Sequence, residues 1–218
     1  MKRNILILMS LLLVIPMVVM GIIRSKPFKL WYYSLVRPNI VFDNSDRCGD
    51  ELKTMGLSLI PQKDFRTDEG CGFENVLKFR QLTIPQNQVI ALTCQMTLAL
   101  VKFEQDVLQP AASKFFQQKI QKIENFGTYN CRKQRKSRFF LSEHARANAI
   151  DIGGFYLEDG TVISVLKHWS NAGKKSEFLR EVSHGACEYF SKVLTPNFDK
   201  LHKDHFHLDM SFWPRCHD

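Results

Sequence analysis

The chain lacks several patterns that would identify common classes of protein. It contains no internal repeat and no low-complexity tract, which argues against a solenoid and against a disordered chain. No two of its cysteines form a CxxC pair, so a zinc knuckle is not expected. The six single cysteines are Cys48, Cys71, Cys94, Cys131, Cys187 and Cys216. An even set of scattered cysteines favours disulfides and an oxidising compartment, but the sequence does not select one pairing.

The chain also lacks a basic field along its length. The net charge is +8, but residues 1–40 carry six Lys and Arg and no acid, which leaves +2 for the remainder. Aromatic and basic residues do not interleave as they do in single-strand-binding proteins, so nucleic acid is not expected as a partner. One local basic cluster covers residues 132–138. It is either a solvated loop or a substrate site in which Arg132 binds a carboxylate through its guanidinium.

The N-terminal segment predicts a membrane anchor. Residues 1–4 are short and basic, and residues 5–23 are apolar except for Ser10 and Gly21. That run is long enough to cross a hydrocarbon core of roughly 30 Å, and no clear small-x-small cleavage site follows it. We therefore expect an uncleaved transmembrane signal anchor rather than a removed signal peptide. Residues 24–45 would be a linker, and residues 46–218 one folded domain.

The topology signals conflict. Basic residues after the apolar run outnumber those before it, which favours a cytoplasmic domain by the positive-inside rule. The cysteines favour the opposite side, and we give them more weight. The sequence thus predicts a single-pass protein of the inner (cytoplasmic) membrane whose domain faces the periplasm.

Apolar spacing predicts an α+β domain with a central antiparallel sheet flanked by helices. Asp159-Gly160 has the chemistry of a tight turn between two strands, and Pro110 should kink or restart the first helix. The expected helices cover residues 93–118 and 176–193, and the expected strands cover residues 119–129, 149–155, 161–166 and 205–210.

Two segments carry four of the seven histidines and predict a metal site. In an extended strand, His205 and His207 point to the same face because side chains repeat every second residue. His144 and Asp151 lie about sixty residues earlier. A His/Asp/His set with a spare position is typical of an open, catalytic zinc site. We therefore predict that His144, Asp151 and His207 bind one Zn²⁺ ion, whereas unrelated surface residues are the weaker interpretation.

These segments resemble a known group of enzymes. The run Ser-x-His-x-x-x-x-Ala-x-Asp at residues 142–151, followed by His-x-His at 205–207, resembles the zinc peptidases of the D-alanyl-D-alanine carboxypeptidase type. That superfamily includes the metal-binding domain of Hedgehog proteins. Residues 142–155 and 202–209 resemble more closely the bacterial extensin-like C-terminal domain family, over roughly Cys48 to Cys216. The resemblance implies a Hedgehog/DD-peptidase-like fold with the ligands on the central sheet.

The resemblance also implies catalytic roles. His205 would lie beside the metal and bind the attacked carbonyl. Asp204 stands where carboxypeptidase relatives place a glutamate general base, and His202 completes the His-x-x-His-x-His spacing of murein endopeptidases. Ala147 stands where the superfamily usually has glycine, and its methyl group is tolerable if the backbone keeps a negative φ.

The expected function is therefore a zinc-dependent peptidase that cleaves peptidoglycan stem peptides with metal-activated water. Asp204 or His202 would be the general base. Asp209 shares the strand face of His207; it either orients a ligand imidazole or is a salt-bridge or surface residue. The alternative function is a non-catalytic module that binds or scaffolds the cell wall and retains the peptidase fold.

Overall fold

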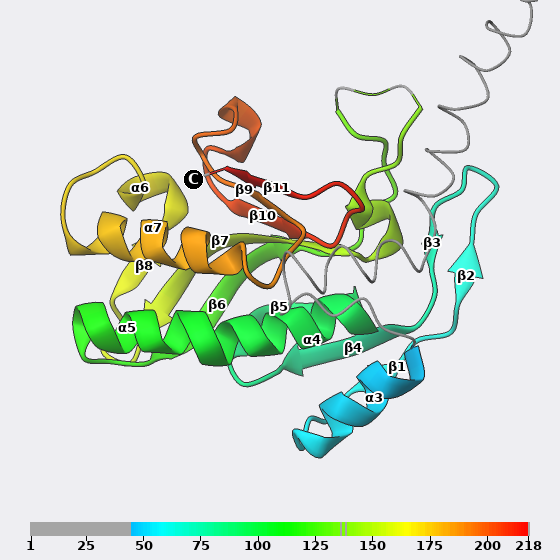
Figure 1. Ribbon diagram of the computed structural model, residues 1–218, viewed down its shortest axis with the longest axis horizontal. Helices are drawn as coiled ribbons and strands as arrows, with labels where there is room; N and C mark the ends of the chain where they lie inside the picture. Colours follow the sequence, from blue (N-terminus) through cyan, green and yellow to red (C-terminus); the bar gives the residue numbers. More distant parts are fainter. Residues whose placement is uncertain (1–44, 136, 138, 218) are drawn as a thin grey trace, which may run out of the picture. The chain divides into compact units, whose positions relative to one another are not determined.

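The computed structural model describes residues 45–217, apart from residues 136 and 138, and Asp43–Asp218 form one compact unit (Figure 1). In this part of the chain, nine strands form one sheet in the order β1-β4-β5-β6-β7-β10-β9-β11, with β8 paired to β7. A separate two-stranded sheet holds β2 and β3. The strands are β1 (Ile60–Pro61), β2 (Phe65–Arg66), β3 (Gly72–Phe73), β4 (Val76–Gln81), β5 (Pro85–Thr93), β6 (Ile120–Gly127), β7 (Ala149–Leu157), β8 (Val162–Ser164), β9 (Lys192–Leu194), β10 (Phe206–Asp209) and β11 (Arg215–His217).

Helical segments connect the strands. They are α3 (Ser45–Thr54), α4 (Cys94–Phe103), the π-helix η1 (Glu104–Leu108), α5 (Gln109–Phe116), the 3₁₀ helix η2 (Glu143–Arg146), α6 (Val165–His168), α7 (Lys174–Ala186) and the 3₁₀ helix η3 (Lys200–His202). α4, η1 and α5 follow one another without a break, and α7 lies beside α5 (Figure 1). Thr93 begins this run by accepting a hydrogen bond from the Met96 N–H at 3.3 Å.

The structure corrects the predicted fold class in two respects. The domain is α+β, but its sheet is mixed, because β5 pairs with β6 and β9 pairs with β11 in parallel. In addition, no helix among the described residues is long and apolar enough to cross a membrane. This finding conflicts with the expected transmembrane helix and with the expected single-pass inner-membrane location. The apolar run at residues 5–23 lies outside the described residues.

The core lies between the helices and one face of the sheet. Phe155 of β7 meets Phe178 of α7 edge to face at 5.7 Å, and Phe103 of α4 meets Phe190 at 5.6 Å. All four rings are fully buried. Phe206 of β10 also packs on this side, against Trp169. Because side chains alternate along a strand, His207 points to the opposite face of the sheet.

All described cysteines form disulfides, as predicted, and the structure supplies the pairing. Cys48 pairs with Cys94, Cys71 with Cys131, and Cys187 with Cys216. The second bond joins the start of β3 to the loop before η2. The third joins the end of α7 to β11. Both of these bonds therefore brace segments that border the site described next.

Candidate metal centre

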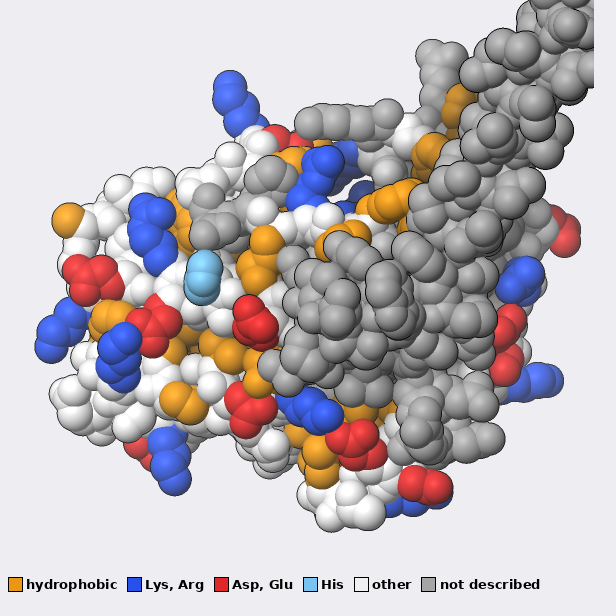
Figure 2. All heavy atoms as spheres, viewed as in Figure 1, with side chains coloured by type: hydrophobic (Ala, Val, Ile, Leu, Met, Phe, Trp, Pro, Cys, Tyr) orange, Lys and Arg blue, Asp and Glu red, His pale blue; other side chains and the backbone are white. Residues whose placement is uncertain are grey.

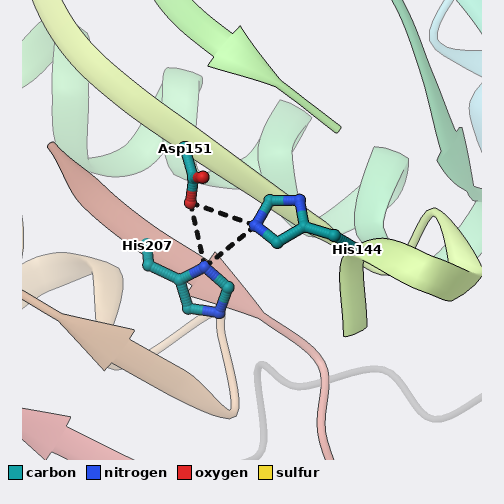
Figure 3. A group of neighbouring side chains, drawn as sticks. All are labelled: His144, Asp151 and His207. Carbon is teal, nitrogen blue, oxygen red and sulfur yellow. Dashed lines mark hydrogen bonds and ion pairs between the residues drawn. The ribbon is translucent and has the colours of Figure 1, made fainter. Parts of the chain in front are cut away.

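The three predicted metal ligands converge on one point (Figure 3). Asp151 of β7 and His207 of β10 are direct partners across an antiparallel strand pair, so their side chains share one face. His144 reaches the same point from η2. The Nε2 of His144 lies 3.2 Å from Asp151 Oδ1 and 3.1 Å from His207 Nδ1, and His207 Nδ1 lies 2.9 Å from Asp151 Oδ1. A strand pair and a helical turn thus fix all three ligand atoms.

The turn that carries His144 is held at both ends. The Ser142 hydroxyl accepts a hydrogen bond from the His144 N–H at 3.4 Å and so caps η2. Ala147 ends η2 in the left-handed conformation, with φ of 52°. The negative φ under which we expected its methyl group to be tolerated is therefore absent. Glycine suits such a position better because it has no Cβ.

Hydrogen bonds outside the triad fix the tautomer of each histidine. His144 Nδ1 donates to the carbonyl oxygen of Thr128 at 2.9 Å, because a carbonyl can only accept. His207 Nε2 donates to the Asp209 carboxylate at 2.9 Å. When the imidazoles are neutral, as metal ligation requires, each therefore turns an unprotonated nitrogen toward Asp151. Three ligand atoms converge there, and either a proton or a metal ion between them relieves their mutual repulsion.

The donor set fits Zn²⁺. Two ligand atoms at tetrahedral zinc lie about 3.3 Å apart, given metal–ligand distances of about 2 Å. The three separations in the triad are 3.2, 3.1 and 2.9 Å, close to that value. Histidine ligands that donate their second N–H to a carboxylate or a carbonyl are typical of zinc sites. Both imidazoles are buried, so the site needs little rearrangement to hold an ion.

Interactions within the triad shift the pKa values of Asp151 and His207. Burial disfavours the charged form of Asp151, but hydrogen bonding and charge interaction with His144 and His207 in their protonated forms outweigh it and hold its pKa well below the usual range. Burial likewise opposes protonation of His207, whereas hydrogen bonds to Asp151 and Asp209 raise its pKa above the ordinary value. A proton on His207 is therefore the natural competitor of a metal ion at this site.

Two more histidines flank the triad, each held by a carboxylate. His205 Nδ1 lies 2.9 Å from Asp204 Oδ1, and His205 Nε2 lies 3.6 Å from Asp151 Oδ1. His202 Nδ1 lies 2.7 Å from Asp199 Oδ1. The rings of His202 and His205 are 5.3 Å apart. His202 and His205 thus line the cleft beside the triad, whereas Asp204 contacts His205 and does not line the cleft.

Asp151 and His207 of the triad line an open cleft of about 860 Å³. Arg132 lines this cleft together with His202 and His205, so the structure brings the predicted substrate-binding residue to the same site. Figure 2 shows Lys or Arg and hydrophobic side chains around a hollow between the C-terminal strands and the loop that precedes η2. A cleft of this size accepts a ligand larger than a single amino acid.

Comparison with known proteins identifies the family. The family described as extensin-like protein C-terminus matches residues 46–217. The chain belongs to this family. No curated protein and no solved structure matches it.

Three residues of the extensin-like site were missed by sequence reasoning. Thr128 contributes only its backbone carbonyl, which leaves no signal in a side-chain pattern. Asp199 lies three residues before His202, a spacing that signals a helical-turn contact only once η3 is known. Lys192 forms a 3.3 Å ion pair with Asp209, across neighbouring strands. Asp209 is buried and contacts both Lys192 and His207, so it forms the salt bridge that the sequence allowed but does not lie at the surface.

Proposed function

We propose that this extensin-like protein is a zinc-dependent peptidase that acts on the peptide stems of peptidoglycan. We further propose that its family belongs to the D-alanyl-D-alanine carboxypeptidase superfamily. One observation carries the proposal: His144, Asp151 and His207 bring three ligand atoms to one point, and Asp151 and His207 line an open cleft. A structural zinc site is usually closed by four protein ligands, whereas three ligands leave a position for water or substrate.

The bound ion would supply an acidified water and a polarised carbonyl, as in other three-ligand zinc sites. The residues of the chain supply the rest. Thr128 and Asp209 orient the two ligand imidazoles, and Lys192 balances the charge of Asp209. This support holds the ligand nitrogens in place before an ion or a substrate arrives, which lowers the cost of reaching the reactive arrangement.

His202 is the best placed proton carrier. Asp199 accepts a hydrogen bond from His202 Nδ1, so His202 Nε2 is an acceptor that can take a proton from the attacking water. Burial lowers the pKa of His202, and Asp199 partly offsets this effect. The imidazole is therefore neutral near neutral pH. It would return the proton to the leaving amine after the amide bond breaks.

His205 would stabilise the oxygen of the attacked carbonyl. The hydrogen bond with Asp204 places the proton on His205 Nδ1 in the neutral ring, so donation from Nε2 requires the protonated ring. Asp204 thus acts through His205, while its role as the base remains the weaker proposal.

The substrate class rests on charge and on the disulfides. Three disulfides are typical of proteins in oxidising compartments, where cell-wall polymers are found. Stem peptides of peptidoglycan end in carboxylates, and Arg132 presents a guanidinium to the cleft. The test is digestion of purified peptidoglycan by zinc-loaded protein, with released peptides identified by mass spectrometry. His202→Ala should abolish release, whereas His184→Ala, at an exposed position away from the cleft, should not.

A second function is favoured by one observation. Asp204, which stands at the sequence position of the glutamate base of carboxypeptidase relatives, is hydrogen-bonded to His205 and does not line the cleft. A module that binds the cell wall without cleaving it would show the same geometry. Unaltered peptidoglycan after incubation with zinc-loaded protein, together with tight sedimentation of the protein with the polymer, would favour this function over hydrolysis.

A further inference from the structure

Exposed aromatic side chains border the cleft. Phe139 is 88% exposed, Phe140 66% and Trp213 60%, and all three line the cleft that contains the metal centre. Large exposed aromatic side chains that line one cleft together with polar groups are typical of an interaction site. We call Phe139, Phe140 and Trp213, with Arg132 and Arg135, the aromatic rim.

Hydrogen bonds and a disulfide hold the loop that carries Phe139 and Phe140. The Ser137 hydroxyl accepts hydrogen bonds from the Phe139 N–H at 3.2 Å and the Phe140 N–H at 3.0 Å. The Gln134 N–H donates to the Phe140 carbonyl at 2.9 Å, and the disulfide of Cys131 holds the base of the loop. These bonds hold the backbone at Phe139 and Phe140 while their rings stay exposed to water, which lowers the entropy lost on binding.

The other side of the aromatic rim is braced in the same way. Trp213 stacks edge to face on Phe212 at 4.6 Å, just before β11. β11 pairs with β9, and the disulfide between Cys187 and Cys216 ties it to the end of α7. Two cross-linked segments, far apart in sequence, thus bring aromatic side chains to one cleft.

The charge of the aromatic rim is positive but sparse. Residues 132–138 include five Lys or Arg, and residues 131–141 contain no acid. Arg132 and Arg135 line the cleft, and within the described part of the chain neither has an acidic partner. Lys192, by contrast, is neutralised by Asp209. Five Lys or Arg and five Asp or Glu line the cleft as a whole. Such a balance suits widely spaced carboxylates and not the dense charge of a polyphosphate.

The exposure of the aromatic rings indicates which kind of uncharged group they can bind. A small apolar side chain binds best in a concave pocket that encloses it, which an 88% exposed ring does not provide. The C–H face of a sugar ring is broad and flat, and it stacks on an aromatic face without enclosure. Guanidinium groups beside the rings can then pair with carboxylates carried by the same strand.

We propose that the aromatic rim binds the sugar strand of a carboxylate-bearing glycopeptide. The protein would then recognise peptidoglycan by its glycan as well as by its peptide stem. The identity of the polymer rests on the proposed function, whereas the preference for a sugar rests on the aromatic rim alone. The strand would lie along Phe139, Phe140 and Trp213, and its carboxylates would meet Arg132 and Arg135.

Binding of matched ligands tests this proposal. The full chain, with disulfides intact, is titrated with a disaccharide–peptide fragment of peptidoglycan and with the free peptide of identical sequence. The double variant Phe139→Ala/Phe140→Ala should weaken binding of the disaccharide–peptide by about tenfold and leave binding of the free peptide unchanged. Leu166→Ala removes an exposed apolar side chain outside the cleft and should change neither affinity. Equal affinity of the wild-type protein for the two ligands would overturn the proposal.

The same titrations in His207→Ala separate this proposal from the proposed function. If this variant neither holds zinc nor cleaves peptidoglycan but still prefers the disaccharide–peptide, the result would support the sugar site independently of the peptidase function. If the wild-type protein cleaves peptidoglycan but shows no preference for the disaccharide–peptide, the peptidase function would be supported and the sugar site would be contradicted. Arg135→Gln should weaken the binding of fragments that carry carboxylates, whereas Arg80→Gln, at an exposed position outside the cleft, should not. Equal losses in both variants would indicate general charge attraction and would overturn the assigned role of Arg135.

Discussion

The Nε2 nitrogen of His207 donates a hydrogen bond to Asp209 at 2.9 Å, and Asp209 lies two residues along the same strand. His207 and Asp209 therefore share one face of β10, and the carboxylate fixes which imidazole nitrogen is free. The same carboxylate accepts an ion pair from Lys192 at 3.3 Å. Because Asp209 orients a predicted metal ligand, we expect its replacement to change the affinity for the metal.

Replacing Asp209 with Asn should weaken zinc binding by about 10- to 100-fold, because the amide orients and polarises the His207 ring less well. Competition with a chromophoric zinc chelator measures this change. The matched control is Asp159→Asn, which alters an exposed carboxylate in the β7–β8 turn. An unchanged zinc affinity in Asp209→Asn would contradict the orienting role of Asp209.

Replacing Asp199 with Asn should lower turnover and shift its pH dependence. The carboxylate stabilises the protonated form of His202, so its loss lowers the pKa of that imidazole. The acidic limb of the kcat profile should therefore move to lower pH, and kcat should fall while KM changes little. A reduced rate with an unshifted profile would indicate that Asp199 only supports the local fold.

The buried carboxyl group of Glu104 should make the stability of the fold depend on pH. Burial raises its pKa from 4.5 to about 7, although Thr83 and Ile84 donate hydrogen bonds that favour the charged form. Between these two pH values the unfolded chain releases a proton that the folded chain keeps. Stability from this residue is therefore fully present below pH 4.5 and is lost as the pH rises through about 7.

The predicted loss is on the order of 3 kcal/mol, from about 1.4 kcal/mol per unit of pKa shift. Urea unfolding at a series of pH values measures it. Glu104→Gln should flatten the stability profile in that interval, whereas Glu74→Gln, at an exposed ion pair, should leave it unchanged. A profile that Glu104→Gln does not alter would show that another group titrates there.

Local signals predicted most of the elements near the site. The Asp159-Gly160 turn joins β7 to β8 as expected, and the strand expected at residues 119–129 is observed as β6. The first helix is also confirmed, but its irregularity is a π-helix at Glu104–Leu108, just before Pro110. Glu104 reaches back to the turn between β4 and β5, a long-range contact that apolar spacing does not record.

Other features depended on the tertiary structure. The second helix ends at Ala186 rather than near residue 193, because the following residues form a turn and then join the sheet as β9. The parallel pairing of β9 with β11 joins segments that sequence patterns treat separately. At the site, side-chain types predicted His144, Asp151 and His207, whereas the backbone carbonyl of Thr128 had no pattern to reveal it.

The metal content of the purified, disulfide-intact protein is the most direct test of the central claim. After zinc is supplied and excess is removed, mass spectrometry should find about one zinc per chain. His144→Ala and His207→Ala should each lose it, while His184→Ala should retain it. Zinc that stays stoichiometric in both ligand variants, or zinc that never binds the wild-type protein, would contradict the metal centre.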